Sequence, residues 1–202
     1  MKLLKEFYIR PDVTQVAREL LGKVLFTDFD EGKTAAIISE VEAYSGRNDK
    51  ACHANNYRRT IRTEIMYHEG GKAYVYLCYG IHHLFNVVTN TDGLADAVLI
   101  RAAIPYIGEE IMIKRRGLNN RKGKVAVGPG TMSQALGIKI QHYGQNLLGD
   151  RIWIEDRGIK IKEKQIQTSA RIGVAYAEED AHKPWRYYIE DKIIDGISGK
   201  IS

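Results

Sequence analysis

The sequence predicts an α+β fold built on a mainly antiparallel sheet, and two observations support this class. Several segments have strand character and are joined by short turns such as Asp30-Glu31-Gly32, which is typical of antiparallel pairing. Helical patterns are few and do not alternate regularly with the strands. The chain has 202 residues and shows no internal repeat or linker, so we expect one domain over 1–202.

The first elements follow from local spacing. Residues 11–22 form a predicted helix whose apolar side chains recur at helical intervals, with Gly22 as its stop. That stripe consists of Val13, Val16, Ala17, Leu20 and Leu21. Residues 23–29 and 34–44 have strand character on either side of a turn and predict a hairpin. Residues 45–64 are polar and irregular.

The rest of the chain predicts more strands and two helices. Strands are expected at 73–79, 84–89, 97–102, 151–155, 159–162 and 186–190. Pro105 opens a predicted helix that runs to Arg116, with acidic residues early and basic residues late, as the helix dipole favours. Residues 117–130 predict a loop. Thr131 and Gln134 fit a capping box that starts a short helix.

Composition limits the possible classes of protein. Thirty basic and 25 acidic residues give a formal charge of +5, which permits a nucleic-acid partner without requiring one. No apolar run approaches the ~20 residues of a membrane helix, so we expect no membrane partner. The two cysteines, Cys52 and Cys78, predict reduced thiols rather than a disulfide framework. We therefore expect an intracellular protein, in the cytoplasm (nucleoid) of a bacterium or the nucleus of a eukaryote.

Sequence signatures of common cofactor sites are missing. The chain contains no G-x-G-x-x-G after a strand, no phosphate-binding loop, no G-x-S-x-G elbow and no zinc-deaminase pattern. His82 and His83 are adjacent, and neighbouring residues of a strand point to opposite faces, so they make a poor chelating pair. We expect neither a cofactor nor a metal ion.

The predicted strand 34–44 carries unusual polar residues. Strict alternation would place Ile38, Glu40, Glu42 and Tyr44 on one face. Two interpretations are open at this stage. The glutamates could lie on an exposed, solvated face, or one carboxylate could sit in a partly apolar, aromatic-walled site and act as a general base.

Aromatic and basic residues suggest a second pattern. Tyr74 and Tyr76 share a strand face and Tyr79 follows at the strand end, which fits either a core cluster or a platform for stacking bases. Arg101 interrupts an apolar strand and needs a partner, which is either a structural carboxylate or Glu42. Two basic loops are candidate phosphate contacts. Their residues are Arg58, Arg59, Arg62, Arg115, Arg116, Arg121 and Lys122.

Together these motifs resemble the alkyladenine (3-methyladenine) DNA glycosylases. The matching stretches are E-V-E-A-Y-x-G-x-x-D-x-A-x-H-A (40–54), R-x-T-x-R (58–62) with Met66, Y-V-Y-x-x-Y-G (74–80), Asn86, V-L-I-R-A-x-x-P (98–105), G-P-G with Q-A-L (128–136), and A-R-I-G-V with K-P-W-R-Y-Y (170–188). They keep the order of that family and cover nearly the whole chain. The resemblance implies one domain around a curved, barrel-like antiparallel sheet with peripheral helices, without a metal or cofactor.

The resemblance also implies a role for each matched residue. Glu42 would be the general base that activates water, helped by Arg101 and the backbone carbonyl of Ile172. Tyr44, His53 and Tyr76 would stack on an extruded base, and Asn86 would crowd the purine and reject guanine. Tyr79 would wedge into the duplex where the base left.

The implied partner is double-stranded DNA with alkylated or deaminated purines, bound by a monomer. Asn55-Asn56-Tyr57 and Thr63 depart from the motif of the family beside the implied pocket. Two other functions remain open on the residues alone. One is a non-catalytic nucleic-acid-binding β module, and the other is a metal-dependent nuclease that uses Glu40, Glu42 and Asp49.

Overall fold

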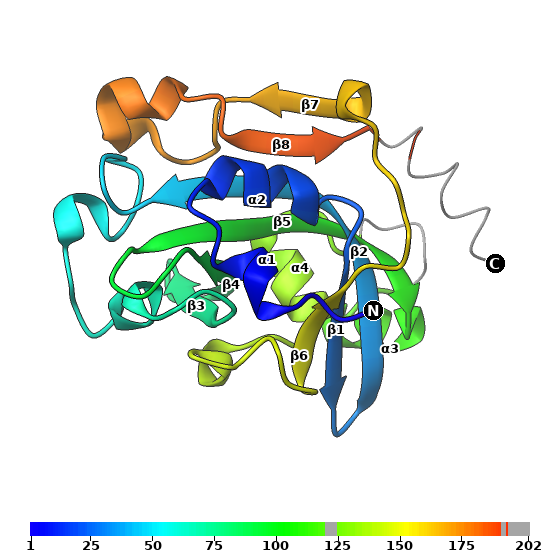
Figure 1. The fold of residues 1–202 in the computed structure, drawn as a ribbon. Helices are drawn as coiled ribbons and strands as arrows, with labels where there is room; N and C mark the ends of the chain where they lie inside the picture. Colours follow the sequence, from blue (N-terminus) through cyan, green and yellow to red (C-terminus); the bar gives the residue numbers. More distant parts are fainter. Residues whose placement is uncertain (120–124, 191–192, 194–202) are drawn as a thin grey trace.

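The computed structural model describes residues 1–119, 125–190 and 193, and its central feature is one antiparallel sheet (Figure 1). The strands are β1 (Val24–Phe29), β2 (Gly32–Ser45), β3 (Ala73–Cys78), β4 (His82–Thr89), β5 (Asp96–Ile107), β6 (Ile152–Glu155), β7 (Ile166–Ser169) and β8 (Arg186–Ile189). Their order is β3-β4-β5-β2-β1-β6, while β8 pairs with both β2 and β7. The predicted α+β class with an antiparallel sheet is therefore confirmed. In the described part of the chain the sheet stays open.

The long strand β2 organises this sheet. Its first half pairs with β1, and Glu40, Val41 and Glu42 pair with β8, while β5 pairs along nearly its whole length. The helices are α1 (Lys5–Tyr8), α2 (Val13–Leu20), α3 (Glu109–Arg116) and α4 (Pro129–Ala135). Short 3₁₀ segments complete the fold at η1 (Asn55–Tyr57), η2 (Glu64–Tyr67), η3 (Ile140–His142), η4 (Glu163–Gln165) and η5 (Ala175–His182).

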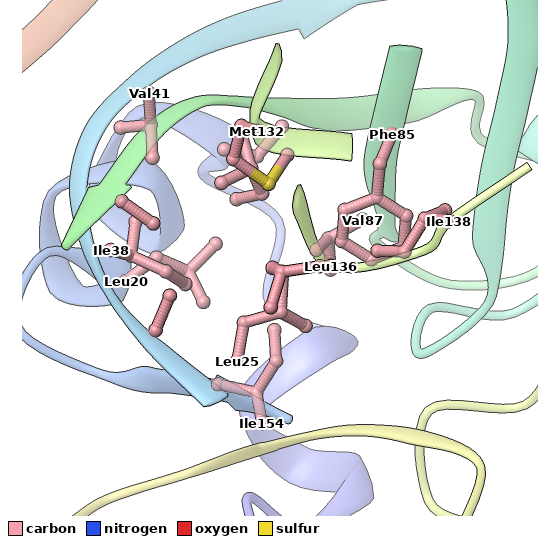
Figure 2. Close-up of a cluster of buried hydrophobic side chains, with 14 of the residues drawn as sticks. Leu20, Leu25, Ile38, Val41, Phe85, Val87, Met132, Leu136, Ile138 and Ile154 are labelled. Carbon is pink, nitrogen blue, oxygen red and sulfur yellow. The ribbon is translucent and has the colours of Figure 1, made fainter. Parts of the chain in front are cut away.

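The main hydrophobic core lies between the sheet and helices α2 and α4. Figure 2 shows Leu20 from α2 and Met132 from α4 close to side chains of the central strands. The predicted stripe of α2 is buried there, and Asp12 caps the helix by accepting the backbone N–H groups of Thr14 and Gln15. The other face of the sheet carries smaller apolar clusters, one around Phe26 and Trp153 and one around Tyr74, together with the buried polar side chain of Glu42.

A bulge in β2 corrects the predicted face pattern. Ile38 pairs with Ala103 of β5 and Glu40 pairs with Ala102, so β2 has one extra residue between two consecutive residues of β5. Ile38 therefore points into the main core with Val41, whereas Glu40 and Glu42 point to the other face, where both contact Arg101. The prediction that Ile38 shares a face with Glu40 was wrong because strict alternation does not hold across a bulge.

The predicted helix starting at Pro105 was also placed too early. Pro105 continues β5, where it lies opposite Ala36, and the helix begins only at Glu109 after Gly108 adopts a φ of 71°. Pairing with the long neighbouring strand outweighs the local preference of this segment for a helix start. The acidic beginning and basic end of α3 are as expected.

Two later elements differ from the sequence prediction. Helix α4 starts at Pro129, and the Thr131 hydroxyl donates to the carbonyls of Val127 and Gly128, so it does not form the predicted capping box. Residues 159–162 form no strand; the strand in this region is β7, which pairs with β8. Within the described residues, no helix has the length and apolar character needed to span a bilayer.

Candidate active site

A row of cross-strand neighbours builds the polar face of the sheet. Pairing aligns Tyr74 of β3 with Asn86 of β4, then Leu99 of β5, Glu42 of β2 and Arg186 of β8. Directly opposed residues in neighbouring strands project to the same side. The sheet therefore brings side chains from five strands into one region around Glu42.

This region contains a cavity of about 440 Å³ with an aromatic and basic lining. Its walls come from the strands, from the segment around His53 and from the segment after Arg171. Side chains that the sequence singled out in this lining are Tyr44, His53, Arg62, Tyr76, Tyr79, Asn86, Arg101 and Ile172. The predicted base-binding residues are thus brought together, in a volume that suits a small planar ligand.

Glu42 is fully buried behind the cavity wall. Its Oε2 accepts a hydrogen bond of 2.7 Å from the Tyr44 hydroxyl, and its Oε1 accepts one of 2.8 Å from the backbone N–H of Ile172. A guanidinium nitrogen of Arg101 lies 3.3 Å from the same Oε1. Burial, followed by the nearby charge of Glu42, raises the pKa of Tyr44 well above its usual value, so the Tyr44 hydroxyl remains a donor.

Arg101 joins two carboxylates. Its Nε donates to Glu40 over 2.8 Å, and Arg186 donates to the same Glu40 oxygen over 2.6 Å. Burial alone would lower the pKa of Arg101, but Glu42 and Glu40 outweigh this and raise it. Arg101 is therefore a permanent cation whose position is fixed by Glu40 and whose charge reaches Glu42 at the cavity wall. The sequence left a structural carboxylate and Glu42 open as partners of Arg101, and Arg101 contacts both Glu40 and Glu42.

A second ion pair, between Arg171 and Asp49, is buried next to the residues that contact Glu42. The Arg171 guanidinium donates to both oxygens of Asp49, over 2.6 and 2.7 Å, and both side chains are completely buried. It also lies 4.8 Å from the centre of the Tyr44 ring. Since Ile172 follows Arg171 directly, this pair fixes the two groups that donate to Glu42.

His53 is held as a neutral imidazole on the cavity wall. Burial, followed by the charges of Arg62 and Arg58, lowers the pKa of His53 to about 4. Its Nε2 lies 3.0 Å from a nitrogen of Arg62, which can only donate, and its Nδ1 lies 2.8 Å from the hydroxyl of Tyr74. The Arg62 guanidinium also covers the Tyr76 ring at 4.7 Å. The cavity thus already stacks one planar cation on an aromatic ring.

Tyr79 stands at the tip of the β3–β4 hairpin and is 91% exposed. Its φ is 51° and that of Gly80 is 73°, while the backbone N–H of Ile81 closes the turn on Cys78. A non-glycine residue in this backbone region costs about 1 kcal/mol or more, and such strain is typical of functional sites. The hairpin therefore holds a large aromatic ring out in solvent at the cavity mouth.

The predicted phosphate contacts divide into engaged and available side chains. Arg59 pairs with Glu64, Arg115 with Glu31, and Arg116 donates to the Val125 carbonyl and to Gln134. Arg58 and Arg62 have no carboxylate partner within the described residues. Arg121 and Lys122 lie outside the residues that the structure describes. Basic composition alone could not distinguish structural arginines from available ones.

Sequence reasoning missed the supporting groups of the site. Arg171 was recognised only as part of a motif, and Asp49 only as part of a motif and as a candidate metal ligand of the nuclease alternative. Their pairing had no signal in the sequence, because the two residues are 122 positions apart. Ile172 contributes its backbone N–H to Glu42, whereas the expected role of its carbonyl stays a prediction. Both Asp49 oxygens face Arg171 rather than the glutamates, and no group of three potential metal-ligating side chains occurs in the described part of the chain.

Comparison with known proteins gives a consistent family. The model of the methylpurine-DNA glycosylase family matches residues 6–193. A protein of Chlamydia felis named for 3-methyladenine DNA glycosylase is 46% identical over 191 residues, covering 94% of this chain and 97% of the relative. A similarly named protein of Chlamydia pneumoniae is 43% identical, and the alignment covers 98% of this chain and 98% of the relative. Another, of Methanocella arvoryzae, is 44% identical, and the alignment covers 92% of this chain and 91% of the relative.

Proposed function

The chain belongs to the methylpurine-DNA glycosylase family and is a DNA glycosylase, and we propose that it removes alkylated purines from duplex DNA by base flipping and hydrolysis. The substrates would be 3-methyladenine, 7-methylguanine and hypoxanthine, which is the deamination product of adenine. The observation that carries this proposal is the buried Glu42 carboxylate directly behind a ring-lined cavity. The enzyme would act as a monomer on DNA inside the cell.

Base flipping explains why the cavity and the hairpin occur together. A base inside the duplex cannot be reached, and rotating it out costs a few kcal/mol. Tyr79 would fill the space left by the base, while Arg58 and Arg62 would contact phosphates on the strand. Both interactions would offset the cost of extrusion. The exposure of Tyr79 at the cavity mouth supports this assignment.

The walls of the cavity suit a cationic purine. Alkylation at N3 or N7 gives the purine a positive charge, which aromatic rings attract by ~0.5–2 kcal/mol. Tyr44, Tyr76 and a neutral His53 would surround the base without adding a positive charge of their own. The base would replace Arg62 on the Tyr76 ring. Asn86, whose amide donates to the Tyr74 carbonyl, would narrow the cavity against the 2-amino group of guanine, so a guanine would be released only when alkylation at N7 has weakened its glycosidic bond.

Hydrolysis would then need one activated water. The alkylated purine is already a good leaving group, so little acid catalysis is required. Glu42 would take a proton from a water held near Arg101 and Ile172, and its charge would stabilise the oxocarbenium character of the sugar. The water oxygen bonds to C1′ as the glycosidic bond breaks, which leaves free base and an abasic site. No lysine of the described residues lines the cavity, so no amine is placed to attack C1′ and we propose no strand cleavage.

The decisive test is release of bases from alkylated duplex DNA. The protein is incubated with the DNA in the presence of a chelator, and the soluble products are separated by chromatography. We expect 3-methyladenine and 7-methylguanine in the supernatant and unbroken strands in the pellet. Binding without base release would favour the β-module interpretation, and chelator-sensitive nicking would favour a nuclease.

Replacing Tyr79 tests the wedge. We expect Tyr79→Ala to weaken binding to lesion DNA about 10-fold, because stacking of one aromatic ring on a base is worth ~1–3 kcal/mol. Alanine meets the same backbone strain at this φ, so the substitution changes the ring alone. Affinity is measured by fluorescence anisotropy on a hypoxanthine duplex. Leu4→Ala, which shortens another exposed apolar side chain, is the matched control. Unaltered affinity in Tyr79→Ala would remove the wedge from the mechanism.

A further inference from the structure

A second hollow of about 730 Å³ lies beside the same hairpin that carries Tyr79. Residues 77–79 line the base cavity, and residues 81–83 line this second hollow. The tip between them is exposed, since Tyr79 and Ile81 are 91% and 71% accessible. A duplex that receives Tyr79 between its bases would therefore lie across both hollows.

Two cations in the second hollow are available for a ligand. Lys139 and Arg151 both line it, both are exposed, and neither forms an ion pair with a carboxylate within the described residues. Arg115 also lines the hollow, but Glu31 neutralises it. Of the lining carboxylates, Asp30 remains beside these two cations, so the available groups carry a net positive charge.

Two histidines add neutral donors. His83 lines the hollow and accepts the backbone N–H of Ile140 through Nδ1, and His142 accepts the N–H of Lys139 in the same way. Burial, followed by neighbouring cations, lowers the pKa of both imidazoles. A neutral imidazole that accepts through Nδ1 carries its proton on Nε2. Each ring therefore offers an N–H group.

We propose that this second hollow binds the phosphodiester backbone of the duplex, with Lys139 and Arg151 as its cationic contacts. Cations and N–H donors in one concave surface match the chemistry of phosphate oxygens. This inference depends on the proposed function only in taking DNA as the partner. Lys139 and Arg151 take the place of the predicted phosphate contacts Arg115 and Arg116, whose guanidinium groups form hydrogen bonds within the protein.

The salt dependence of binding to undamaged duplex tests this surface without requiring base excision. Each phosphate contact contributes about −0.9 to the slope of log K against log salt concentration. The double variant Lys139→Ala/Arg151→Ala should therefore bind more weakly at low salt, with a slope less negative by about 1.8. Both side chains are exposed, and circular dichroism checks that the variant is folded.

The matched control removes the same charge elsewhere. Lys160 and Lys162 are exposed between β6 and β7 and line neither hollow. Lys160→Ala/Lys162→Ala should leave the slope at the wild-type value. An unchanged slope in Lys139→Ala/Arg151→Ala, or an equal change in the control pair, would overturn the proposal. Base release from alkylated DNA is scored separately, so loss of the glycosylase assignment and loss of this surface give different results.

Discussion

Glu42→Gln is expected to lower the rate of base release by about 10²–10⁴-fold, the contribution typical of a positioned general base. The substitution removes proton acceptance and negative charge while keeping the size of the side chain. Single-turnover release of 7-methylguanine from methylated duplex measures the chemical step directly. Binding to lesion DNA should persist, because the aromatic walls and Tyr79 are unchanged. A wild-type rate in Glu42→Gln would remove Glu42 from the mechanism.

The local hydrogen bonds allow glutamine to fit. Its carbonyl oxygen can accept from the Ile172 N–H and face Arg101, as Oε1 of Glu42 does. Its amide can donate to Tyr44, whose hydroxyl then accepts instead of donating. Glu40→Gln is the matched control, because Glu40 contacts Arg101 and Arg186, whereas only Glu42 bonds to the cavity-lining residues Tyr44 and Ile172. If Glu40→Gln lost more activity than Glu42→Gln, Glu40 would be the better candidate base.

The sequence was sufficient for most strands because their signals are local. Turns and β-branched runs placed most ends of strands β1 to β6 and β8 within a few residues of their observed positions. The failures came from long-range pairing. Ile38 changes face at a bulge, and Pro105 extends β5 because β2 is there to pair with it. Local propensity contains no information on either partner strand.

The candidate site shows the same division. The motif residues Glu42, Tyr44, His53, Tyr76 and Arg101 do meet around one cavity, as the family resemblance implied. Their supports were not predictable, because a salt bridge between residues 122 positions apart leaves no periodic trace. The basic loops were the least predictable part. A guanidinium such as that of Arg115 resembles a phosphate contact in sequence, until the structure pairs it with Glu31.

The Asp49–Arg171 pair is expected to have the largest effect on stability. Asp49→Ala would leave the Arg171 guanidinium buried without its counter-ion, and breaking a buried pair in this way costs about 3–5 kcal/mol. Natural domains are stable by only ~5–15 kcal/mol, so much of the free energy of unfolding would be lost. Urea denaturation followed by circular dichroism measures the change. The exposed pair Arg10–Glu19 provides a control, and Glu19→Ala should alter the midpoint little.

A double variant separates two effects: the loss of stability caused by an unpaired buried charge, and the loss of activity caused by removing Arg171. In Asp49→Ala/Arg171→Met no buried charge remains unpaired, so this protein should be more stable than Asp49→Ala alone. Its activity should nevertheless stay low, because the Arg171 guanidinium under the Tyr44 ring and its bond to the Ala43 carbonyl are gone. Recovery of stability without recovery of base release would show that Arg171 positions the donors of Glu42. Full activity in the double variant would instead leave Arg171 with a purely structural role.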